Sequence, residues 1–219
     1  MSPQPILMAV PKGRILKELR PLLSRAGITP EPDFENENNR KLKFETNVPG
    51  FEIIRVRSFD AATFVAFGAA QFGVAGNDVL MEFDYDALYA PLDLGIGNCR
   101  LSLCQPAGAP KVDLRKLSHI RVATKFPNFT QNYFAQMGVQ AECIELSGAM
   151  ELAPLLGLAP FMVDLVASGE TLRANNLVEI EKMADVSSRL IVNRAAYKTQ
   201  GALLKPWLDK FRKAVEEAG

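Results

Sequence analysis

The 219-residue sequence contains a single histidine and three cysteines, and its 25 basic and 25 acidic residues leave no formal net charge. Balanced charge excludes a general electrostatic attraction to nucleic acid or to a membrane surface, so local clusters of cations must hold any anionic ligand. The cysteine spacing matches no metal site, and the odd number argues against a disulfide framework. We therefore predict reduced thiols. His119 stands just before a predicted strand and is interpreted as structural.

Long apolar runs, a signal-peptide pattern, low-complexity segments and internal repeats are also missing. A membrane-spanning helix needs about 20 consecutive apolar residues, and no run approaches that length. The N-terminus shows no charged and apolar regions of the secretory type. We expect a cytoplasmic protein that neither crosses a membrane nor binds nucleic acid. The length is sufficient for one large domain or two small ones.

Strand-like and helical segments alternate along the whole chain. This alternation predicts an α/β fold with open, mostly parallel sheets covered on both faces. Pro106, Gly108 and Pro110 mark a first crossing between domains, and a strand at 189–193 is expected to return to the first. The predicted domains are residues 1–102 with 186–219, and residues 103–185. They form two α/β lobes with a ligand-binding cleft between them.

Residues 161–172 form the most informative stretch of the chain. An apolar run typical of a buried strand leads into a loop of small and hydroxyl-bearing residues, and a helix is expected to follow. Exposed N–H groups and a helix dipole at such a turn favour an anion. Gly169 allows close approach of the backbone, Ser168 and Thr171 can donate hydroxyl hydrogen bonds, and Asp164 is placed to accept from ribose hydroxyls. An ordinary strand–loop–helix crossover is the alternative.

The first half of the chain carries candidate cations. Lys12 and Arg14 flank a glycine at a strand-to-helix turn, which suits a polyphosphate, although solvated cations at a turn remain an alternative. A strand at 51–57 is predicted to carry Arg55 and Arg57 on the same face, because side chains alternate along a strand.

Three further local expectations concern caps, a proline and an acidic turn. Pro21 predicts that the helix at 15–26 is kinked or begins later. Ser58 or Asp60 is expected to cap a helix at 61–67. The acidic residues Glu82, Asp84 and Asp86 are interpreted as a solvated turn, since the rest of a calcium-binding pattern is missing.

Several motifs lie in order along nearly the whole chain. They are Val-Pro-Lys-Gly-Arg at 10–14, Arg40 before an alternating strand, Arg-Ser-Phe-Asp at 57–60, Gly-Val-Ala-Gly-Asn-Asp-Val-Leu at 73–80, Asp-Leu-Gly-Ile-Gly-Asn-Cys-Arg-Leu at 93–101, Ala-Thr-Lys-Phe-Pro-Asn at 123–128, Glu-Leu-Ser-Gly-Ala-Met-Glu-Leu-Ala-Pro at 145–154 and Val-Asp-Leu-Val-Ala-Ser-Gly-Glu-Thr-Leu-Arg-Ala-Asn at 163–175. With this set of motifs the chain resembles the ATP phosphoribosyltransferase family in its short form.

The resemblance implies a type II periplasmic-binding-protein-like fold and transfer of phosphoribosyl from phosphoribosyl pyrophosphate to N1 of ATP. This reaction, the first step of histidine biosynthesis, uses Mg²⁺, for which we predict no direct protein ligand. Short-form members work with a histidyl-tRNA-synthetase-like regulatory subunit in a hetero-octamer, and a homodimer of the catalytic subunit is expected. The chain ends after one predicted helix, without room for the regulatory domain of long-form members.

Site roles follow from the resemblance and from the chemistry of the residues. Arg57, with Arg14 and Lys12, is expected to hold the leaving pyrophosphate and the ATP phosphates, because an arginine presents paired donors to phosphate oxygens. Arg40 is expected to help hold the nucleotide, and Glu145 is a candidate for the ribose or metal side. The substrate-binding loop is expected to contribute Asp164, Ala167, Ser168, Gly169, Glu170 and Thr171. No side-chain nucleophile is required.

Two other functions fit parts of the pattern. A phosphoribosyltransferase of the other common design would carry paired acidic residues at the strand end, whereas here Val163 precedes Asp164. A non-catalytic solute-binding protein would share the two-lobed shape, but such proteins are typically exported and the chain shows no export signal.

Overall fold

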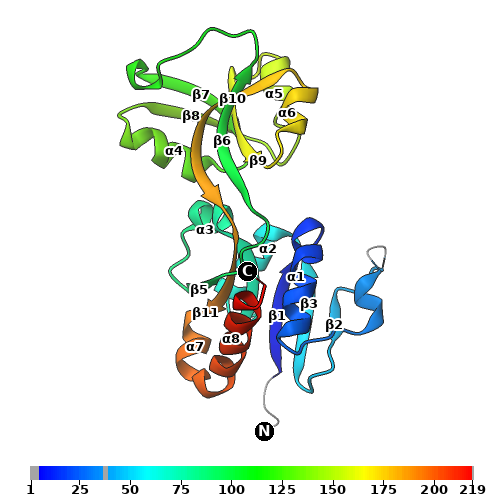
Figure 1. Cartoon of the computed structure of the whole chain (residues 1–219). Coiled ribbons are helices and arrows are strands. Elements are labelled where there is room, and N and C mark those ends of the chain that lie inside the picture. The colour runs from blue at the N-terminus through cyan, green and yellow to red at the C-terminus, as the bar shows by residue number, and fades with distance from the viewer. Residues whose placement is uncertain (1–4, 37–38, 219) are drawn as a thin grey trace. The chain divides into compact units, whose positions relative to one another are not determined.

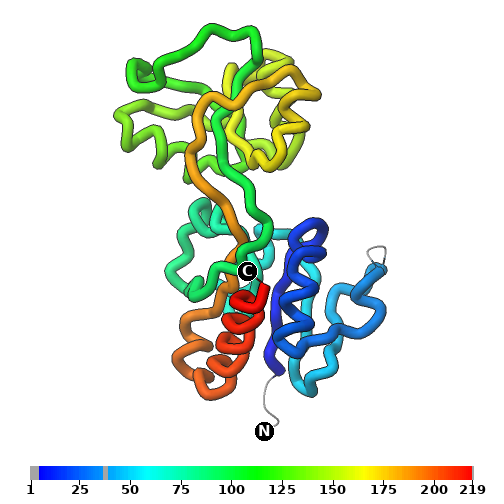
Figure 2. Tube along the Cα trace, viewed as in Figure 1, coloured from blue at the N-terminus to red at the C-terminus, as the bar shows by residue number. Residues whose placement is uncertain are grey.

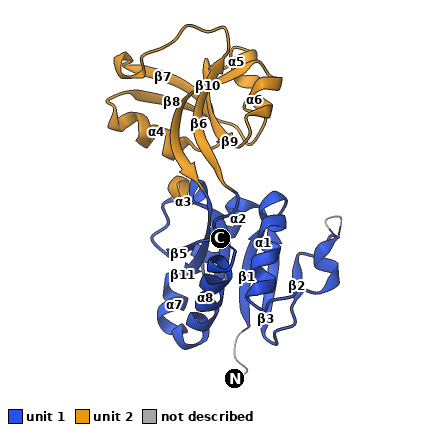
Figure 3. Cartoon of the chain, in the orientation of Figure 1, with its two compact units in different colours: residues 1–80, 84–97, 187–219 blue, residues 81–83, 98–186 orange. Residues whose placement is uncertain are grey.

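A computed structural model of the chain describes residues 5–36 and 39–218, which fold into two compact units (Figures 1 and 3). Unit 1 comprises residues 1–80, 84–97 and 187–219, and unit 2 comprises residues 81–83 and 98–186. Figure 2 follows the chain from unit 1 into unit 2 and back. Apart from the short stretch 81–83, the chain passes into unit 2 after Gly97 and not after residue 102, because the whole of strand β6 (Cys99–Pro106) pairs within the second sheet. Within the described ranges, no helix is long and apolar enough to span a membrane.

Unit 1 is built on a six-stranded sheet with the order β2-β3-β1-β4-β11-β5. Its strands are β1 (Ile6–Pro11), β2 (Lys43–Glu45), β3 (Phe51–Val56), β4 (Phe72–Gly76), β5 (Leu88–Asp93) and β11 (Ser188–Asn193). Strand β1 is parallel to β3 and β4, whereas the other pairings are antiparallel. The prediction of a mostly parallel sheet is therefore wrong. The unpredicted strand β5 contains Pro91 and is partly exposed, so its sequence lacks a strong strand pattern.

Two amphipathic helices cover one face of this sheet. They are α1 (Arg14–Arg25) and α8 (Gly201–Glu216), which contact each other (Figure 1) and bury Leu19 and Phe211 in the same core as Met8 of β1. Helix α1 begins at Arg14 and continues through Pro21, so the expectation of a later start is wrong. Its leucines are buried on both sides of the proline, and this burial offsets the one backbone hydrogen bond that Pro21 cannot make.

Helix α2 (Ser58–Ala66) packs against β1 and β4 through smaller residues. A side chain on Gly73 would place its Cβ atom 2.7 Å from Cγ2 of Val65, so only glycine permits this approach. Arg57 occupies the N-cap position of α2 and no side chain caps the helix, so the expected Ser58 or Asp60 cap is wrong. The shorter helices of this part of the chain are a 3-10 turn at Pro32–Glu35, α3 (Asn77–Phe83) and α7 (Arg194–Thr199).

Unit 2 is built on a five-stranded sheet with the order β10-β6-β9-β7-β8. The strands following β6 are β7 (His119–Thr124), β8 (Gln140–Glu145), β9 (Phe161–Val166) and β10 (Leu177–Val186). Strand β7 is parallel to β8 and β9, whereas β6 is antiparallel to β9 and β10. The helices are α4 (Pro127–Gln136), α5 (Leu152–Leu155) and α6 (Glu170–Ala174), with a 3-10 turn at Leu114–Lys116. This sheet is also mixed.

Glu82 does not belong to a solvated acidic turn. Its side chain is buried, and its carboxylate accepts hydrogen bonds from the backbone N–H groups of Asn128 at 3.1 Å and Phe129 at 3.0 Å. Both donors lie in the first turn of α4, where N–H groups have no partner within the helix. Glu82 therefore caps a helix more than 40 residues away in the sequence. In the described part of the chain, no cluster of three metal-ligating side chains includes it.

We expect Glu82→Ala to lower the free energy of unfolding by about 2 kcal/mol, because it leaves two N–H groups of α4 without an acceptor. Chemical denaturation followed by circular dichroism measures this change. Asp86→Ala is the matched control, since Asp86 is an exposed carboxylate of the same segment. An equal effect of the two substitutions would contradict the capping role.

The cysteines have the environment of structural thiols. The structure forms no disulfide among them, and burial raises the pKa of Cys104 to about 12 and that of Cys143 to about 11. Neither is suited to act as a nucleophile at neutral pH, because the thiolate is the reactive form. His119 is exposed on β7, with its Nε2 atom 3.6 Å from the Glu142 carboxylate.

Candidate functional site

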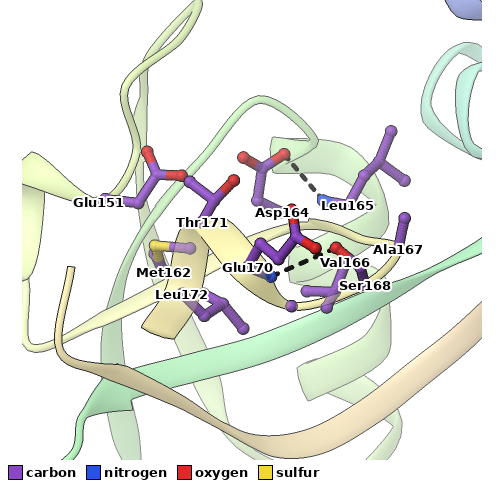
Figure 4. Close-up of a pocket in the computed structure, with 11 residues that line it drawn as sticks. Glu151, Met162, Asp164, Leu165, Val166, Ala167, Ser168, Glu170, Thr171 and Leu172 are labelled. Atoms are coloured by element: carbon purple, nitrogen blue, oxygen red, sulfur yellow. Dashed lines mark hydrogen bonds between the residues drawn. The ribbon is translucent and has the colours of Figure 1, made fainter. Parts of the chain in front are cut away.

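A pocket of about 230 Å³ lies in unit 2 where β9 turns into α6 (Figure 4). The residues that line it are Glu151, Met162, Asp164, Leu165, Val166, Ala167, Ser168, Gly169, Glu170, Thr171 and Leu172. Every residue predicted for the substrate-binding loop is among them. The structure thus gathers Asp164 and the loop around a single pocket, as an anion site requires.

The conformation of the loop follows from its sequence. Gly169 is the N-cap residue of α6 and has φ of 72°, a left-handed conformation that other residues adopt only with strain. The Ser168 hydroxyl accepts a hydrogen bond from the N–H of Glu170 at 3.4 Å. Asp164 is partly buried within β9, where its Oδ1 atom accepts from the N–H of Leu165 at 2.8 Å (Figure 4). The turn therefore keeps the Asp164 carboxylate beside the loop.

The helix expected after the loop is present but short. Helix α6 has only 5 residues, little more than one turn, and its dipole can contribute little. Any phosphate in this pocket must be held mainly by loop N–H groups, hydroxyl groups and a cation supplied from elsewhere.

Two arginines hold the loop from outside the pocket. The Nη1 atom of Arg100 donates to the carbonyl oxygens of Val166 at 3.5 Å and Ala167 at 3.1 Å, and Nη1 of Arg173 donates to the carbonyl of Ser168 at 3.1 Å. In a trans peptide the N–H points opposite to the C=O. The N–H groups that follow these three carbonyls therefore point away from the arginines.

The charge of the pocket is unusual for a phosphate site. Its lining includes the carboxylates of Glu151, Asp164 and Glu170, and none of the eleven lining residues is lysine or arginine. Like charges repel, so an anionic ligand would bind here in company with a cation. The Asp164 carboxylate, in contrast, is well suited to accept hydrogen bonds from sugar hydroxyls.

In unit 1, three predicted phosphate-binding cations lie at the edge of the sheet formed by the carboxyl ends of β1 and β3. Strands β1 and β3 are parallel, and Pro11 pairs with Val56 at their carboxyl ends. Lys12 and Arg57 immediately follow these paired residues, and both side chains are exposed. Arg14 follows Lys12 by two residues, begins α1 and forms an ion pair with Glu18 at 3.2 Å. Three of the predicted phosphate-binding cations therefore lie at the same edge, although their residues come from two separate turns.

Arg55 differs from its predicted companion Arg57. Strand β3 ends at Val56, so Arg57 lies outside the strand, and the expectation that the two arginines share a strand face is wrong. Arg55 is buried, and its guanidinium donates to the carbonyl oxygens of Phe34, Asn36 and Asn39 at 2.9–3.1 Å. Arg55 therefore contacts the backbone of Asn39, the residue before Arg40.

Arg40 and Glu145 also lie near the ends of sheet strands. The exposed Arg40 precedes β2, which runs antiparallel to β3, and the carbonyl of Leu42 still accepts from the N–H of Arg55 at 2.8 Å. Arg40 therefore lies near the carboxyl end of β3, which is the end that Arg57 follows. Glu145 is exposed at the carboxyl end of β8 and does not line the pocket.

The reasoning from sequence missed Arg100, Arg173 and Glu151. Arg173 stands five residues after Ser168, within reach of a local pattern, but Arg100 is separated from Ala167 by 67 residues. Only the antiparallel pairing of β6 with β9 brings Arg100 beside the loop. Glu151 precedes α5 and reaches the pocket through the packing of α5 against β9.

Comparison with known proteins places this geometry in a family. The family profile described as ATP phosphoribosyltransferase matches residues 57–213. An ATP phosphoribosyltransferase of Paramagnetospirillum magneticum is 61% identical over 216 residues, with 98% of this chain and 99% of the relative covered. One from Rhodospirillum rubrum is 58% identical, with 96% and 93% covered.

Solved structures agree with the fold. The chain is similar to the ATP phosphoribosyl transferase (HisG:HisZ) complex from Thermotoga maritima, with a TM-score of 0.81, 30% identity and coverage of 97% of this chain and 99% of that one. The periplasmic aliphatic sulphonate binding protein SsuA from Escherichia coli has a TM-score of 0.60 at 14% identity, covering 98% of this chain and 69% of SsuA. The likeness to SsuA shows the fold alone. Together with the two α/β units, it confirms the predicted type II periplasmic-binding-protein-like fold.

Proposed function

The chain belongs to the ATP phosphoribosyltransferase family, which catalyses the first step of histidine biosynthesis, and we propose that its Asp164 pocket binds the phosphoribosyl donor. The reaction transfers phosphoribosyl from phosphoribosyl pyrophosphate to N1 of ATP and releases pyrophosphate. The observation that carries the proposal is the convergence of Asp164 and the loop at 167–171 on one pocket in a chain 61% identical to a family member.

The donor has two parts that match the pocket. Asp164 accepts hydrogen bonds from the ribose hydroxyls, because an ionised carboxylate is a strong acceptor. The 5′-phosphate binds at the loop, where the N–H groups point away from the two arginines and where Ser168 and Thr171 add hydroxyl donors. Gly169 lets the backbone come close to the phosphate oxygens.

The donor set of the pocket fits Mg²⁺. This ion prefers oxygen ligands and is usually bound by one or two carboxylates together with substrate phosphates and water. Glu151, Asp164 and Glu170 supply carboxylate oxygens at the pocket, which lacks any basic lining residue. When bound with the donor, Mg²⁺ would neutralise the pyrophosphate charge. Among the described residues no group of three metal-ligating side chains occurs, and the absence of a direct protein ligand to the ion stays a prediction.

The cations of unit 1 complete the proposed chemistry. Adenine N1 is a weak nucleophile, and the sugar carbon becomes oxocarbenium-like as pyrophosphate leaves, so catalysis depends on alignment and on stabilising the charge of the leaving group. Arg57, Lys12 and Arg14 stand at one edge of the sheet and supply that positive charge. Arg40 helps to hold the nucleotide, and Glu145 stays a candidate for the ribose or metal side.

The two other functions considered from the sequence fit less well. Strand β9 presents a single carboxylate, Asp164, with the buried Val163 before it, whereas the other phosphoribosyltransferase design uses an acidic pair. Likeness to the solute-binding protein SsuA comes at 14% identity, compared with 61% for a relative named as the transferase.

The proposed partners rest on the similarity to the Thermotoga maritima structure, which is a HisG:HisZ complex. The alignment covers 97% of this chain and 99% of the Thermotoga chain, which fits the short form. This similarity supports a HisZ-like regulatory subunit. We propose a hetero-octamer of catalytic and regulatory subunits that contains a homodimer of this chain.

A pyrophosphate-release assay with ATP, phosphoribosyl pyrophosphate and Mg²⁺ tests the function. It is run with and without the regulatory subunit, since the chain alone can be slow. We expect release to require both substrates and to yield N1-(5-phosphoribosyl)-ATP, identified by mass spectrometry. Release with a free base in place of ATP, or binding of phosphoribosyl pyrophosphate without turnover in the presence of the partner, would contradict the proposal.

A further inference from the structure

Arg100 connects three elements of unit 2 behind the pocket. Its Nε atom lies 2.7 Å and 2.9 Å from the two carboxylate oxygens of Glu179 on β10, and its Nη2 atom also contacts that carboxylate. Its Nη1 atom donates to the carbonyl oxygens of Val166 at the end of the neighbouring strand β9 and of Ala167 just after it. Ser102 of β6 donates its hydroxyl to Glu179 at 2.8 Å and fixes the carboxylate. The guanidinium is therefore shared between a fixed anion and the loop.

Arg100 is not placed to bind phosphate itself. It is absent from the pocket lining, and its charge is matched by Glu179 at hydrogen-bond distance. The hydrogen bond from Arg100 holds the pKa of the Glu179 carboxyl below its usual range, so the pair stays ionised at neutral pH. Arg100 instead orients backbone groups of the loop. Because it holds the carbonyl oxygens of Val166 and Ala167, the N–H groups that follow them in the chain point away from Arg100.

We propose that Arg100, held by Glu179, is a positioning residue. It keeps residues 166–169, the end of β9 and the first part of the loop, in the conformation that binds the donor's 5′-phosphate. The inference rests on the proposed function and goes beyond it by assigning a role to a residue outside the pocket. A preformed loop binds its ligand more tightly, because less conformational entropy is lost on binding.

Only arginine suits this position. Its planar fork presents donors in several directions, so one side chain reaches the Glu179 carboxylate and the loop carbonyls together. Lysine has a single nitrogen on a flexible chain and cannot hold both at the same time. Arg100→Lys therefore keeps the charge and removes the connection. Glu179→Gln keeps the acceptor shape and removes the charge that fixes the arginine.

The test compares Arg100→Lys and Glu179→Gln with Arg121→Lys in the complex with the regulatory subunit. Arg121 forms a similar ion pair with Glu142 at 2.8 Å in the same sheet and has no contact with the loop. We expect Arg100→Lys to raise KM for phosphoribosyl pyrophosphate about tenfold and Glu179→Gln about threefold, with KM for ATP within about twofold of the wild type. Arg121→Lys is expected to leave both values unchanged.

The pattern of the two KM values separates positioning from a general effect on folding. A purely structural role would lower the melting temperature and the amount of active enzyme without a selective change in KM for the donor. Active wild-type enzyme together with an unchanged donor KM in Arg100→Lys would overturn the positioning role alone. Wild-type protein that releases no pyrophosphate with its partner would instead overturn the proposed function.

Discussion

Replacing Arg57 by alanine is expected to lower turnover about 100-fold or more, which corresponds to about 3 kcal/mol of barrier. Arg57 follows the end of β3 next to Lys12, at the edge where we place the phosphates. Charge grows on the pyrophosphate as its bond to the sugar breaks, so a guanidinium that contacts it stabilises the transition state more than the bound substrates. The substitution should therefore lower kcat, while calorimetry should still detect binding of phosphoribosyl pyrophosphate to unit 2.

The matched control is Arg212→Ala. Arg212 is an exposed arginine of α8 in the same unit, paired with Asp209 and distant in sequence from the edge. Pyrophosphate release measured for both variants, with melting temperatures recorded in parallel, checks the prediction. Near-normal turnover of Arg57→Ala would remove this residue from the catalytic set.

Asp164→Asn is expected to lower kcat/KM for phosphoribosyl pyrophosphate about 100-fold, because hydrogen bonds between a charged acceptor and two ribose hydroxyls together contribute about 3 kcal/mol. The asparagine side chain has the same shape and retains an oxygen that can accept from the N–H of Leu165. The fold of the loop should therefore be preserved. Calorimetric titration with the donor and Mg²⁺ should show the loss as weaker binding.

Asp185→Asn serves as the control for Asp164. Asp185 is a carboxylate of β10 in the same sheet that pairs with Lys182 at 2.8 Å and lies outside the pocket lining. If the two substitutions change donor binding equally, the effect comes from the overall charge of unit 2, and Asp164 has no specific role. The variants of Arg57 and Asp164 together test separately the catalytic role proposed for unit 1 and the donor binding proposed for unit 2.

Local features of the site were predictable from the sequence. Gly169 is required by a left-handed turn, and a strand followed by small and hydroxyl-bearing residues is typical of a loop that exposes N–H groups. Lys12 and Arg57 follow strands of the same sheet, and the carboxyl ends of parallel strands meet at one edge. These features depend on residues a few positions apart, so their patterns can be read without the fold.

Other features could not be predicted because they depend on strand pairing. The directions of β2 relative to β3 and of β11 relative to β4 and β5 make the first sheet mixed, and no local pattern encodes those directions. Glu82 and the first turn of α4 are 46 residues apart in the sequence, so local patterns indicate a solvated carboxylate and not a helix cap. The shortness of α6 was also missed, since Leu172 and Ala174 suit a longer helix until Leu177 joins β10.

The sequence by itself determined the α/β class and the family, and it predicted the residues that we propose to contact the substrates. These depend on residue type and on short spacings, which the chain carries in any conformation. Tertiary structure alone decided that Arg100 holds the loop, that Arg55 is buried, and that three carboxylates share the pocket with no lining cation. Such contacts exist only once strand order and register are set, because they join side chains whose separation in the sequence carries no periodic signal.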